Sequence, residues 1–246
     1  MLIAHSHTSS AKFNRSVVSS VAVATSNDGP GNSADALHRV LALGQSRIVR
    51  EGMAIHRVSD PLRSLFFLRT GVAKRIMLQE DGREQILGFP LPGEILGLEA
   101  MGNDQHSSTV SALDMCAVVE VPYAALEALM ARDNEVAKFI YQRISAALRE
   151  EHGWLAALGL LTAEERVAAF LLDLSRRFAA RGFSDHRFLL RMTRAEIGGF
   201  LGLTLETVSR VFSKFQRSGV LAVERREIEI LDMNRLSSIG LCRVMH

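Results

Sequence analysis

The sequence predicts an α+β protein with an N-terminal antiparallel β-roll, a long dimerisation helix and a C-terminal winged helix-turn-helix domain. Three observations predict this fold class. Short strand-like runs separated by turn signals fill residues 45–122, a helical pattern follows Pro122, and two short helices joined by a glycine-containing turn lie near the C-terminus. With 246 residues, of which 48% are hydrophobic, the chain is long enough for two domains that each have a core.

The roll is assigned to residues 35–132 and is expected to be cupin-like. Turn signals such as Thr70-Gly71 and Asp81-Gly82 separate its short runs. Many short strands at this spacing favour an antiparallel barrel or roll. The strand-sized pieces are SRIVR, MAIHRV, SLFFLRT, VAKRIML, EQILGF, STVSAL and CAVVEV. Residues 1–34 are rich in Ser, Ala, Asn and Gly, and we expect a flexible tail there.

Residues 133–161 are predicted to form one long helix that pairs with a second copy. Its seam has strict 4-3 spacing, and three such heptads between two domains favour a symmetric dimer, with packing on the chain's own body as the alternative. Glu151 would face its twin across the axis, so this carboxylate should weaken the dimer unless it turns outward at a frayed end. The seam comprises Ala137, Tyr141, Ile144, Leu148, Glu151, Leu155 and Leu158.

The segment after Thr162 has the outline of a winged helix-turn-helix. Thr193 and Glu196 form a capping box that starts one helix, and Gly202 supplies a tight turn. Thr204 then caps a second helix, which Gly219 ends. The runs VLAV and EIEI follow as a short hairpin. We therefore assign residues 162–246 to a DNA-binding domain.

The second helix carries a polar triplet. Glu206, Ser209 and Arg210 stand at i, i+3 and i+4, so they project from one side. In a helix-turn-helix the second helix enters the major groove. There Arg210 can donate two hydrogen bonds to guanine, Glu206 can accept one from cytosine, and Ser209 can contact either kind of base. The residues expected to contact DNA phosphates are Arg194, Thr204, Lys214 and Arg217.

The distribution of charge agrees with this interpretation. Residues 162–246 carry 14 Lys+Arg and 10 Asp+Glu, a net charge of +4, whereas residues 1–161 carry a net charge of −2. The alternative is a solvated helix with an i, i+4 Glu–Arg pair worth about 0.3–0.5 kcal/mol. The capped helix, glycine turn, basic flank and hairpin together favour DNA recognition.

Three stretches resemble the cyclic-AMP receptor protein and fumarate-nitrate-reduction regulator (CRP/FNR) superfamily, and its second branch in particular. They are TAEERVAAFLLDLSRRFAARGFS, MTRAEIGGFLGLTLETVSRVFSKFQRSGVLAV and GREQILGFPLPGEILGLEAMG, and the resemblance covers about residues 45–235. It implies an effector roll, a dimer helix and a winged domain, in a homodimer that binds a double-stranded DNA palindrome and recruits RNA polymerase. It also implies control of anaerobic, microaerobic or redox-related genes.

The resemblance also assigns particular residues. LETVSR carries the Glu, Ser and Arg of the oxygen-sensing branch, and Leu205 stands where the cyclic-AMP branch has an arginine, which implies TTGAT-like half-sites. Glu151 falls where the oxygen sensor has an acidic residue that tunes dimerisation. The Asp81-Gly82-Arg83 turn matches the second activating surface less well, since Arg83 replaces an acid. The loop resembling the contact for the polymerase α subunit contains Arg181, Gly182, Phe183 and Ser184.

The iron–sulfur cluster of the oxygen-sensing branch is not expected here. That branch holds a [4Fe–4S] cluster on three N-terminal cysteines and one in the roll, and four thiolates are the usual requirement. In this chain no cysteine precedes Cys116, and Val119 corresponds to the fourth ligand. Since the two residues are three apart on a strand, they should face opposite ways. An intrachain cluster of the standard kind is therefore excluded, and the chain is expected to be FixK-like.

Cyclic-nucleotide binding is not expected either, because the family's pocket has changed. Its Gly-Glu pair becomes Gly97-Leu98, with Glu99 one place late, and its Arg-Ser or Arg-Ala pair becomes Ser107-Ser108. Without a cation the cyclic phosphate has little to pair with.

Two sensor hypotheses stay open beside a regulator that is set by its own abundance. One is redox chemistry at Cys116, whose alternative is a buried small hydrophobe. The other is haem bound by His56 or His106, whose alternative is that both histidines are bystanders. Our expectation is that the protein holds no cofactor and no metal.

Other functional classes and locations were weighed as well. A ligand-binding regulatory module that acts through protein–protein contacts is the alternative function. No enzyme is expected, because no histidine–nucleophile pairing, metal-ligand spacing or phosphate-cradling loop stands out. The longest apolar stretch, Trp154–Ala163, is half the length of a membrane span, and the Ser16–Thr25 segment is too serine-rich for a signal peptide. We therefore expect a cytoplasmic protein without membrane contact.

Overall fold

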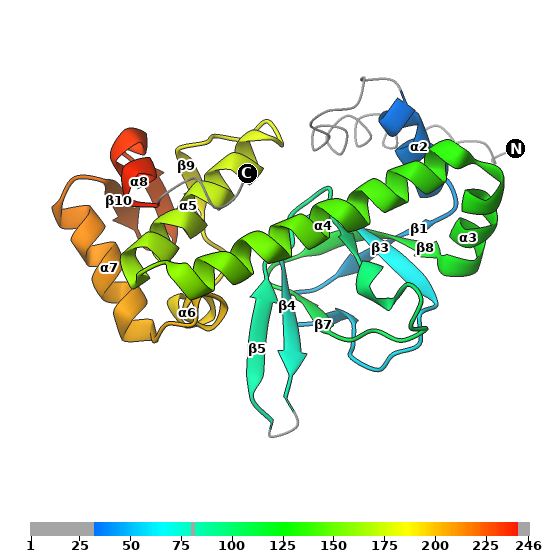
Figure 1. The fold of residues 1–246 in the computed structure, drawn as a ribbon, viewed down its shortest axis with the longest axis horizontal. Coiled ribbons are helices and arrows are strands. Elements are labelled where there is room, and N and C mark those ends of the chain that lie inside the picture. The colour runs from blue at the N-terminus through cyan, green and yellow to red at the C-terminus, as the bar shows by residue number, and fades with distance from the viewer. Residues whose placement is uncertain (1–31, 80–81, 241–246) are drawn as a thin grey trace, which may run out of the picture.

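The computed structural model describes residues 32–79 and 82–240, and it confirms the predicted fold class. A β-roll and a small helical domain with its own sheet are joined by one long helix (Figure 1). The tail predicted over residues 1–34 lies largely outside the described residues. Its last three residues differ from the prediction, because helix α2 (Asn32–Leu41) begins at Asn32.

The roll consists of two antiparallel four-stranded sheets. In the first sheet the order is β1 (Gln45–Val49), β8 (Cys116–Pro122), β3 (Ser64–Thr70) and β6 (Ile95–Leu96). In the second it is β2 (Ala54–His56), β7 (Thr109–Ala112), β4 (Ala73–Leu78) and β5 (Glu84–Gly88). Each predicted strand piece overlaps one of these strands, and β6 is an addition.

Strand β3 of the first sheet is buried on both faces, which explains its continuous apolar run. Phe66 and Leu68 pack into the interior of the roll, whereas Leu65 and Phe67 pack on the other side against helices. Those helices are α2, α3 (Tyr123–Arg132) and the first half of α4 (Asn134–Leu160). A strand covered on both faces carries no polar alternation.

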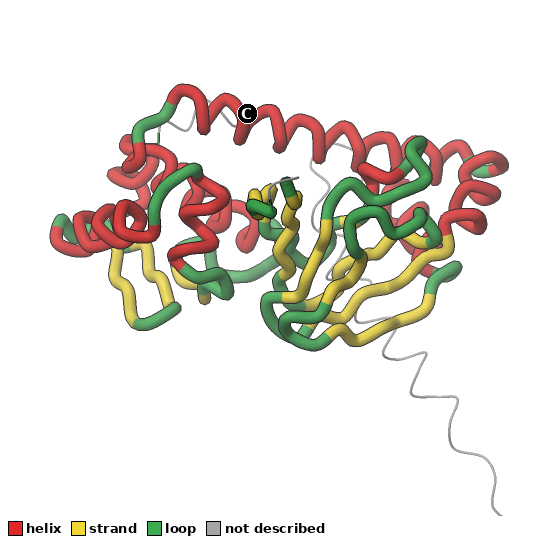
Figure 2. Tube along the Cα trace, turned by 90° about the horizontal axis from the view of Figure 1, so that it is seen from below, coloured by secondary structure: helices red, strands yellow, loops and turns green. Residues whose placement is uncertain are grey.

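Helix α4 is the connecting element between the two domains. Asp133 caps its N-terminus by accepting hydrogen bonds from the amides of Glu135 and Val136. Near this end Phe139 is buried against the roll, and near the other end Trp154 is buried against the C-terminal domain. Figure 2 shows α4 running along one side of both domains.

The C-terminal domain contains four helices and a three-stranded sheet among the described residues. The helices are α5 (Ala163–Ala179), α6 (Arg194–Leu201), α7 (Leu205–Arg217) and α8 (Met233–Ile239). The strands are β10 (Leu221–Glu224), β11 (Glu227–Ile230) and β9 (Arg187–Leu189), in that order. The predicted hairpin is β10–β11, and β9 and α8 are elements that the sequence pattern did not indicate.

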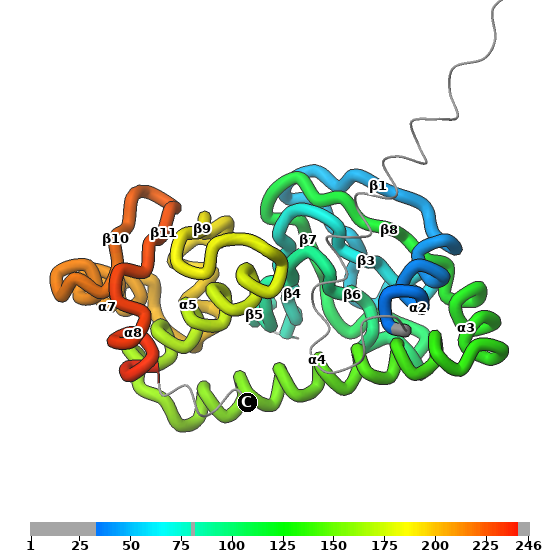
Figure 3. The backbone as a smooth tube through the Cα atoms, turned by 90° about the horizontal axis from the view of Figure 1, so that it is seen from above, coloured from blue at the N-terminus to red at the C-terminus, as the bar shows by residue number. Residues whose placement is uncertain are grey.

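One hydrophobic cluster contains residues of both the roll and the C-terminal domain, and the two domains lie side by side along α4 (Figure 3). Phe89 of the roll packs edge-on against Phe200 of α6 with ring centroids 5.7 Å apart, and Trp154 packs against the same ring at 4.7 Å. An ion pair of 2.7 Å joins Lys74 of β4 to Glu196 of α6. Helix α6 is thus held against the β4–β5 hairpin, which orients the helix that follows it. Within the described part of the chain, no helix combines the length and the apolar character that crossing a bilayer requires.

Candidate nucleic-acid interface

The helix-turn-helix is built by the local signals that the sequence contains. Thr193 Oγ1 accepts a hydrogen bond from the Glu196 amide at 3.1 Å, and a Glu196 carboxylate oxygen accepts one from the Thr193 amide at 2.8 Å. This capping box starts α6. Gly202 ends α6 in the left-handed region, at φ +64°. Gly198 is also required, because a Cβ there would lie 2.5 Å from the Leu203 carbonyl oxygen.

Helix α7 is anchored by one face and exposed on the other. Thr204 caps it by accepting a hydrogen bond from the Thr207 amide at 3.2 Å. Gly219, at φ +70°, follows its last turn. Its buried side chains are Val208, Val211, Phe212 and Phe215. Because four apolar groups hold one side in the core, the orientation of the opposite side is fixed.

The polar triplet lies on that opposite side, as the sequence predicts. Glu206 and Arg210 are exposed and Ser209 is half-buried. Arg210 Nη2 donates a hydrogen bond to Thr207 Oγ1 at 3.2 Å, which keeps the guanidinium near the first turn of the helix. Backbone amides at the helix N-terminus, helped by Thr204, lower the pKa of Glu206, so its carboxylate is charged and able to accept hydrogen bonds.

Two of the expected phosphate contacts are exposed cations, and a third is an exposed hydroxyl. Lys214 Nζ lies 2.5 Å from Glu164 in an exposed ion pair that an anion can replace, and exposed Arg217 contacts the Ser213 carbonyl at 3.3 Å. Thr204 is exposed as well, with its hydroxyl used as the helix cap.

Arg194 differs from that expectation. Its guanidinium stacks over the Phe212 ring at 3.5 Å, and burial lowers its pKa to about 10. In this structure the Arg194 guanidinium packs on α7 and does not extend into solvent. The sequence predicted a phosphate contact for Arg194 from its place near the start of α6, but it did not predict the contact with Phe212.

The expected polymerase-contact loop requires a correction at Arg181. This side chain is only 7% exposed, it pairs with Glu94 of the roll at 2.8 Å, and it donates to the carbonyls of Pro92 and Arg177. Its guanidinium therefore holds the two domains together and is not presented to a partner. Gly182 (φ +78°), Phe183 and Ser184 stay at the surface, with the Phe183 side chain exposed.

The dimer seam is partly exposed and partly used within the chain. Tyr141, Leu148 and Leu155 are exposed apolar groups on α4, whereas Ile144 packs against the roll and Leu158 is half-buried. A large apolar side chain in water is unfavourable unless something covers it, and three at seam spacing are what a paired helix presents.

Glu151 is neither unpartnered nor at a frayed end. Its carboxylate lies 2.7 Å from Arg75 Nη2 of β4 and stays half-exposed.

Cys116 is a buried thiol inside the roll. Burial, with Asp114 nearby, raises its pKa to about 12, and its Sγ donates to the Val72 carbonyl at 3.4 Å. A thiol held protonated is a poor nucleophile, which favours the small-hydrophobe interpretation. Cys116 and Val119 pack on opposite faces of the sheet, as their spacing predicts.

One cluster that the sequence pattern did not bring together is His56, Glu99 and His106. Both histidines are buried, and their rings stack with centroids 3.9 Å apart. Burial, with His106 alongside, lowers the pKa of His56 to about 4, so its imidazole is neutral near pH 7. The three residues lie in separate segments of the chain, so no local sequence motif predicts that they meet.

Both domains of this chain match known protein families. Residues 46–133 match the cyclic nucleotide-binding domain and residues 165–239 match the Crp-like helix-turn-helix domain. The chain is 39% identical over 208 residues to the transcriptional activator protein FnrA of Stutzerimonas stutzeri, covering 85% of this chain and 82% of that protein. It is 38% identical over 192 residues to the fumarate and nitrate reduction regulatory protein of Escherichia coli K12, covering 78% and 77%. The structure of FixK2 from Bradyrhizobium japonicum matches with a TM-score of 0.74 and 33% identity, over 80% of this chain and 96% of that one.

Proposed function

Since this chain belongs to the CRP/FNR family of DNA-binding transcription activators, we propose that it acts as a homodimer on a palindrome of TTGAT-like half-sites. The proposal includes recruitment of RNA polymerase and control of anaerobic, microaerobic or redox-related genes. The proposal includes no enzymatic step, since the relatives of this chain described above are regulators. The observation that carries it is α7, which presents Glu206, Ser209 and Arg210 on the face opposite its buried anchor.

The chemistry of that face supports reading of base edges. A guanidinium forms two hydrogen bonds with the O6 and N7 atoms of guanine, and a carboxylate accepts one from the amino group of cytosine. Lys214 and Arg217 lie farther along α7, where contact with the phosphate backbone positions the helix without reading sequence. Polymerase recruitment is assigned to the surface around Phe183, since Arg181 is engaged within the chain.

The test is a gel-shift titration with a TTGAT-type palindrome and a scrambled duplex of the same length. We expect Arg210→Ala to cost about 1–3 kcal/mol at one base pair per half-site, because the bidentate contact is lost. Lys214→Ala is the matched control, and it should weaken binding to both duplexes alike, with a smaller salt dependence. Equal affinity of the unchanged protein for both duplexes would refute the proposal, as would full discrimination in Arg210→Ala.

Operation without an iron–sulfur cluster is part of the same proposal. The chain has two cysteines, whereas a [4Fe–4S] cluster takes four thiolates. Cys116 points into the roll interior and hydrogen-bonds there, which supports a structural role.

The dimer axis is proposed to run along the exposed seam of α4. Neutralising Glu151, as Glu151→Leu, should then strengthen association, because it removes two carboxylates that face each other near the axis. Arg75→Ala is the opposite variant: it leaves Glu151 without its ion-pair partner and should weaken the dimer. Sedimentation equilibrium measures both. An unchanged or weaker dimer in Glu151→Leu would place this residue away from the axis.

A further inference from the structure

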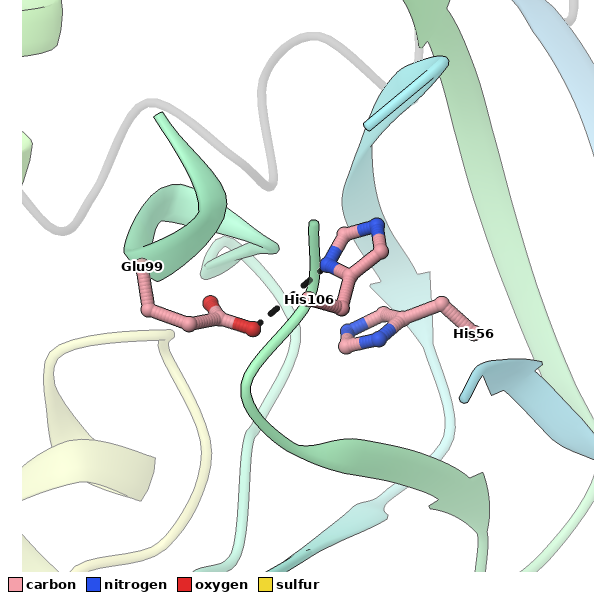
Figure 4. A group of neighbouring side chains, drawn as sticks. All are labelled: His56, Glu99 and His106. Atoms are coloured by element: carbon pink, nitrogen blue, oxygen red, sulfur yellow. Dashed lines mark ion pairs between the residues drawn. The ribbon is translucent and has the colours of Figure 1, made fainter. Parts of the chain in front are cut away.

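Three potential ligand groups meet inside the roll, at a place that the proposed DNA interface does not use. His56 ends β2, Glu99 lies in the short helix η2 (Leu98–Ala100), and His106 lies in the loop before β7. The Glu99 carboxylate faces His106, and the His56 ring lies beside the His106 ring (Figure 4). His56 is 4% exposed and His106 is 3% exposed, so water does not solvate the rings freely.

Three of the four ring nitrogens make no hydrogen bond of good geometry with the described residues. They are both nitrogens of His56 and Nδ1 of His106, and the Ser108 backbone is the polar group close to His56. The nearest carboxylate oxygen of Glu99 lies 3.5 Å from His106 Nδ1, which is long for a hydrogen bond. Buried polar groups without partners are costly and rare in folded proteins. Two such rings side by side make this the place in the roll where a ligand would relieve that cost.

The spacing of the donor atoms suits a metal ion. One nitrogen from each histidine and one oxygen from Glu99 all lie within 4.8 Å of one another. Ligands of a tetrahedral ion at 2.0–2.1 Å lie about 3.3 Å apart, so the donor atoms are near ligand spacing and must move closer together when an ion binds.

The surroundings hold these groups in place. Ser108 Oγ, itself buried, donates to the Glu99 carboxylate at 3.2 Å, and Phe66 stacks on His56 with centroids 5.8 Å apart. Gly97 adopts φ +91°, and a Cβ there would come within 2.8 Å of the His106 ring. Hydrogen bonds to a ligating carboxylate and tight packing of a ligating ring are what orient metal ligands in proteins.

We propose that His56, Glu99 and His106 form a binding site for a divalent first-row transition-metal ion, with Zn²⁺ as the probe. Two imidazoles and one carboxylate match Zn²⁺ or Fe²⁺, whereas Ca²⁺ and Mg²⁺ prefer oxygen ligands alone. Three protein ligands leave a coordination position open for water or another small ligand. This proposal replaces the expectation that the protein holds no metal, and it does not depend on the proposed DNA binding.

The site also lies next to the residues that hold the long helix. Leu98 and Met101, on either side of Glu99 in sequence, pack on the cluster that includes Phe139 and Ile140 of α4. A metal that fixes Glu99 therefore fixes a segment in contact with α4.

The test uses the full-length protein, stripped of metal with a chelator and titrated with Zn²⁺ in competition with a chromophoric chelator. We expect one tight Zn²⁺ per chain. Two variants, Glu99→Gln and His56→Phe, should each weaken Zn²⁺ binding by at least about 100-fold, since each removes a ligand. Glutamine keeps the size of Glu99 and an oxygen that accepts the hydrogen bond from Ser108. His56→Phe leaves no unpaired nitrogen at its position, so the metal-free variant should melt no lower than the metal-free parent. Zn²⁺ should raise the melting temperature of the parent and leave that of these two variants nearly unchanged.

The controls address three of the six other histidines of the chain. His186→Gln removes an exposed imidazole beside Asp185, and the double variant His5→Gln/His7→Gln removes two that lie outside the described residues. Both should bind Zn²⁺ as the parent does. The proposal is overturned if the parent fails to compete with the chelator, if Glu99→Gln and His56→Phe keep the parent's affinity, or if either control removes the tight site.

Discussion

Leu155→Asp is expected to convert the protein to a monomer and to remove nearly all of its selective affinity for a palindrome. Leu155 is 71% exposed on α4, at the seam position one turn beyond Glu151. In the proposed dimer it meets its own copy, and burying one leucine is worth about 1.5–3 kcal/mol. Aspartate removes that gain on both chains and adds like charges that cost several kcal/mol more. A monomer contacts one half-site, so the roughly 10²–10⁴-fold advantage of simultaneous engagement is lost.

The matched control is Leu160→Asp on the same helix. Leu160 is 77% exposed but lies off the seam, so this variant adds the same charge to an equally accessible position. It should stay dimeric. Sedimentation equilibrium gives the oligomeric state, and gel shifts on one-half-site and two-half-site duplexes give the affinities. Dimers of equal strength in both variants would move the dimer interface away from this face of α4.

The helix-turn-helix could be predicted because its signals are local. Thr193 with Glu196, Gly202, Thr204 and Gly219 each act on neighbours within about four residues in sequence, and each occupies the expected place. The heptad seam is local in the same sense. A pattern with helical period can be interpreted from sequence alone, because the helix itself fixes which side chains share a face.

Elements that exist only through long-range pairing were missed. Strand β6 is two residues long, and it is a strand because Ile95 and Leu96 pair with Phe67 and Phe66 of β3. Strand β9 likewise depends on its pairing with β11. Neither segment is long enough to show the alternation that predicts a strand, so the partner determines the conformation.

The site residues follow the same rule. The triplet on α7 needs only helix geometry, and the sequence placed it on the exposed face. Arg181 and Arg194 were expected at the surface, but Glu94 and the Phe212 ring take up their guanidinium groups. The histidine cluster was missed because His56 and His106 are fifty positions apart and meet only when β2 and β7 pair.

Arg177→Met is expected to reduce the free energy of unfolding by about 3 kcal/mol, the lower end of the cost of breaking a buried ion pair. Arg177 of α5 lies at the junction of the two domains. Its guanidinium is 2.8 Å from Glu94, 2.8 Å from the Phe89 carbonyl and 3.2 Å from Asp173. Burial opposes its charge, but Glu94, Asp173 and Glu150 outweigh that effect and hold its pKa above the ordinary value. Removal therefore leaves a buried carbonyl without a donor and two carboxylates less well compensated.

Arg176→Met is the matched control one residue earlier on α5. Arg176 also pairs with Asp173, at 2.8 Å, but it is half-exposed, so its loss should cost less than about 1 kcal/mol. Urea unfolding followed by the fluorescence of Trp154 measures both, because this single tryptophan lies in the aromatic cluster shared by the roll and α6. Equal losses in the two variants would mean that the contacts of Arg177 with Glu94 and Phe89 add nothing to stability, and that the other contacts between the domains hold them together.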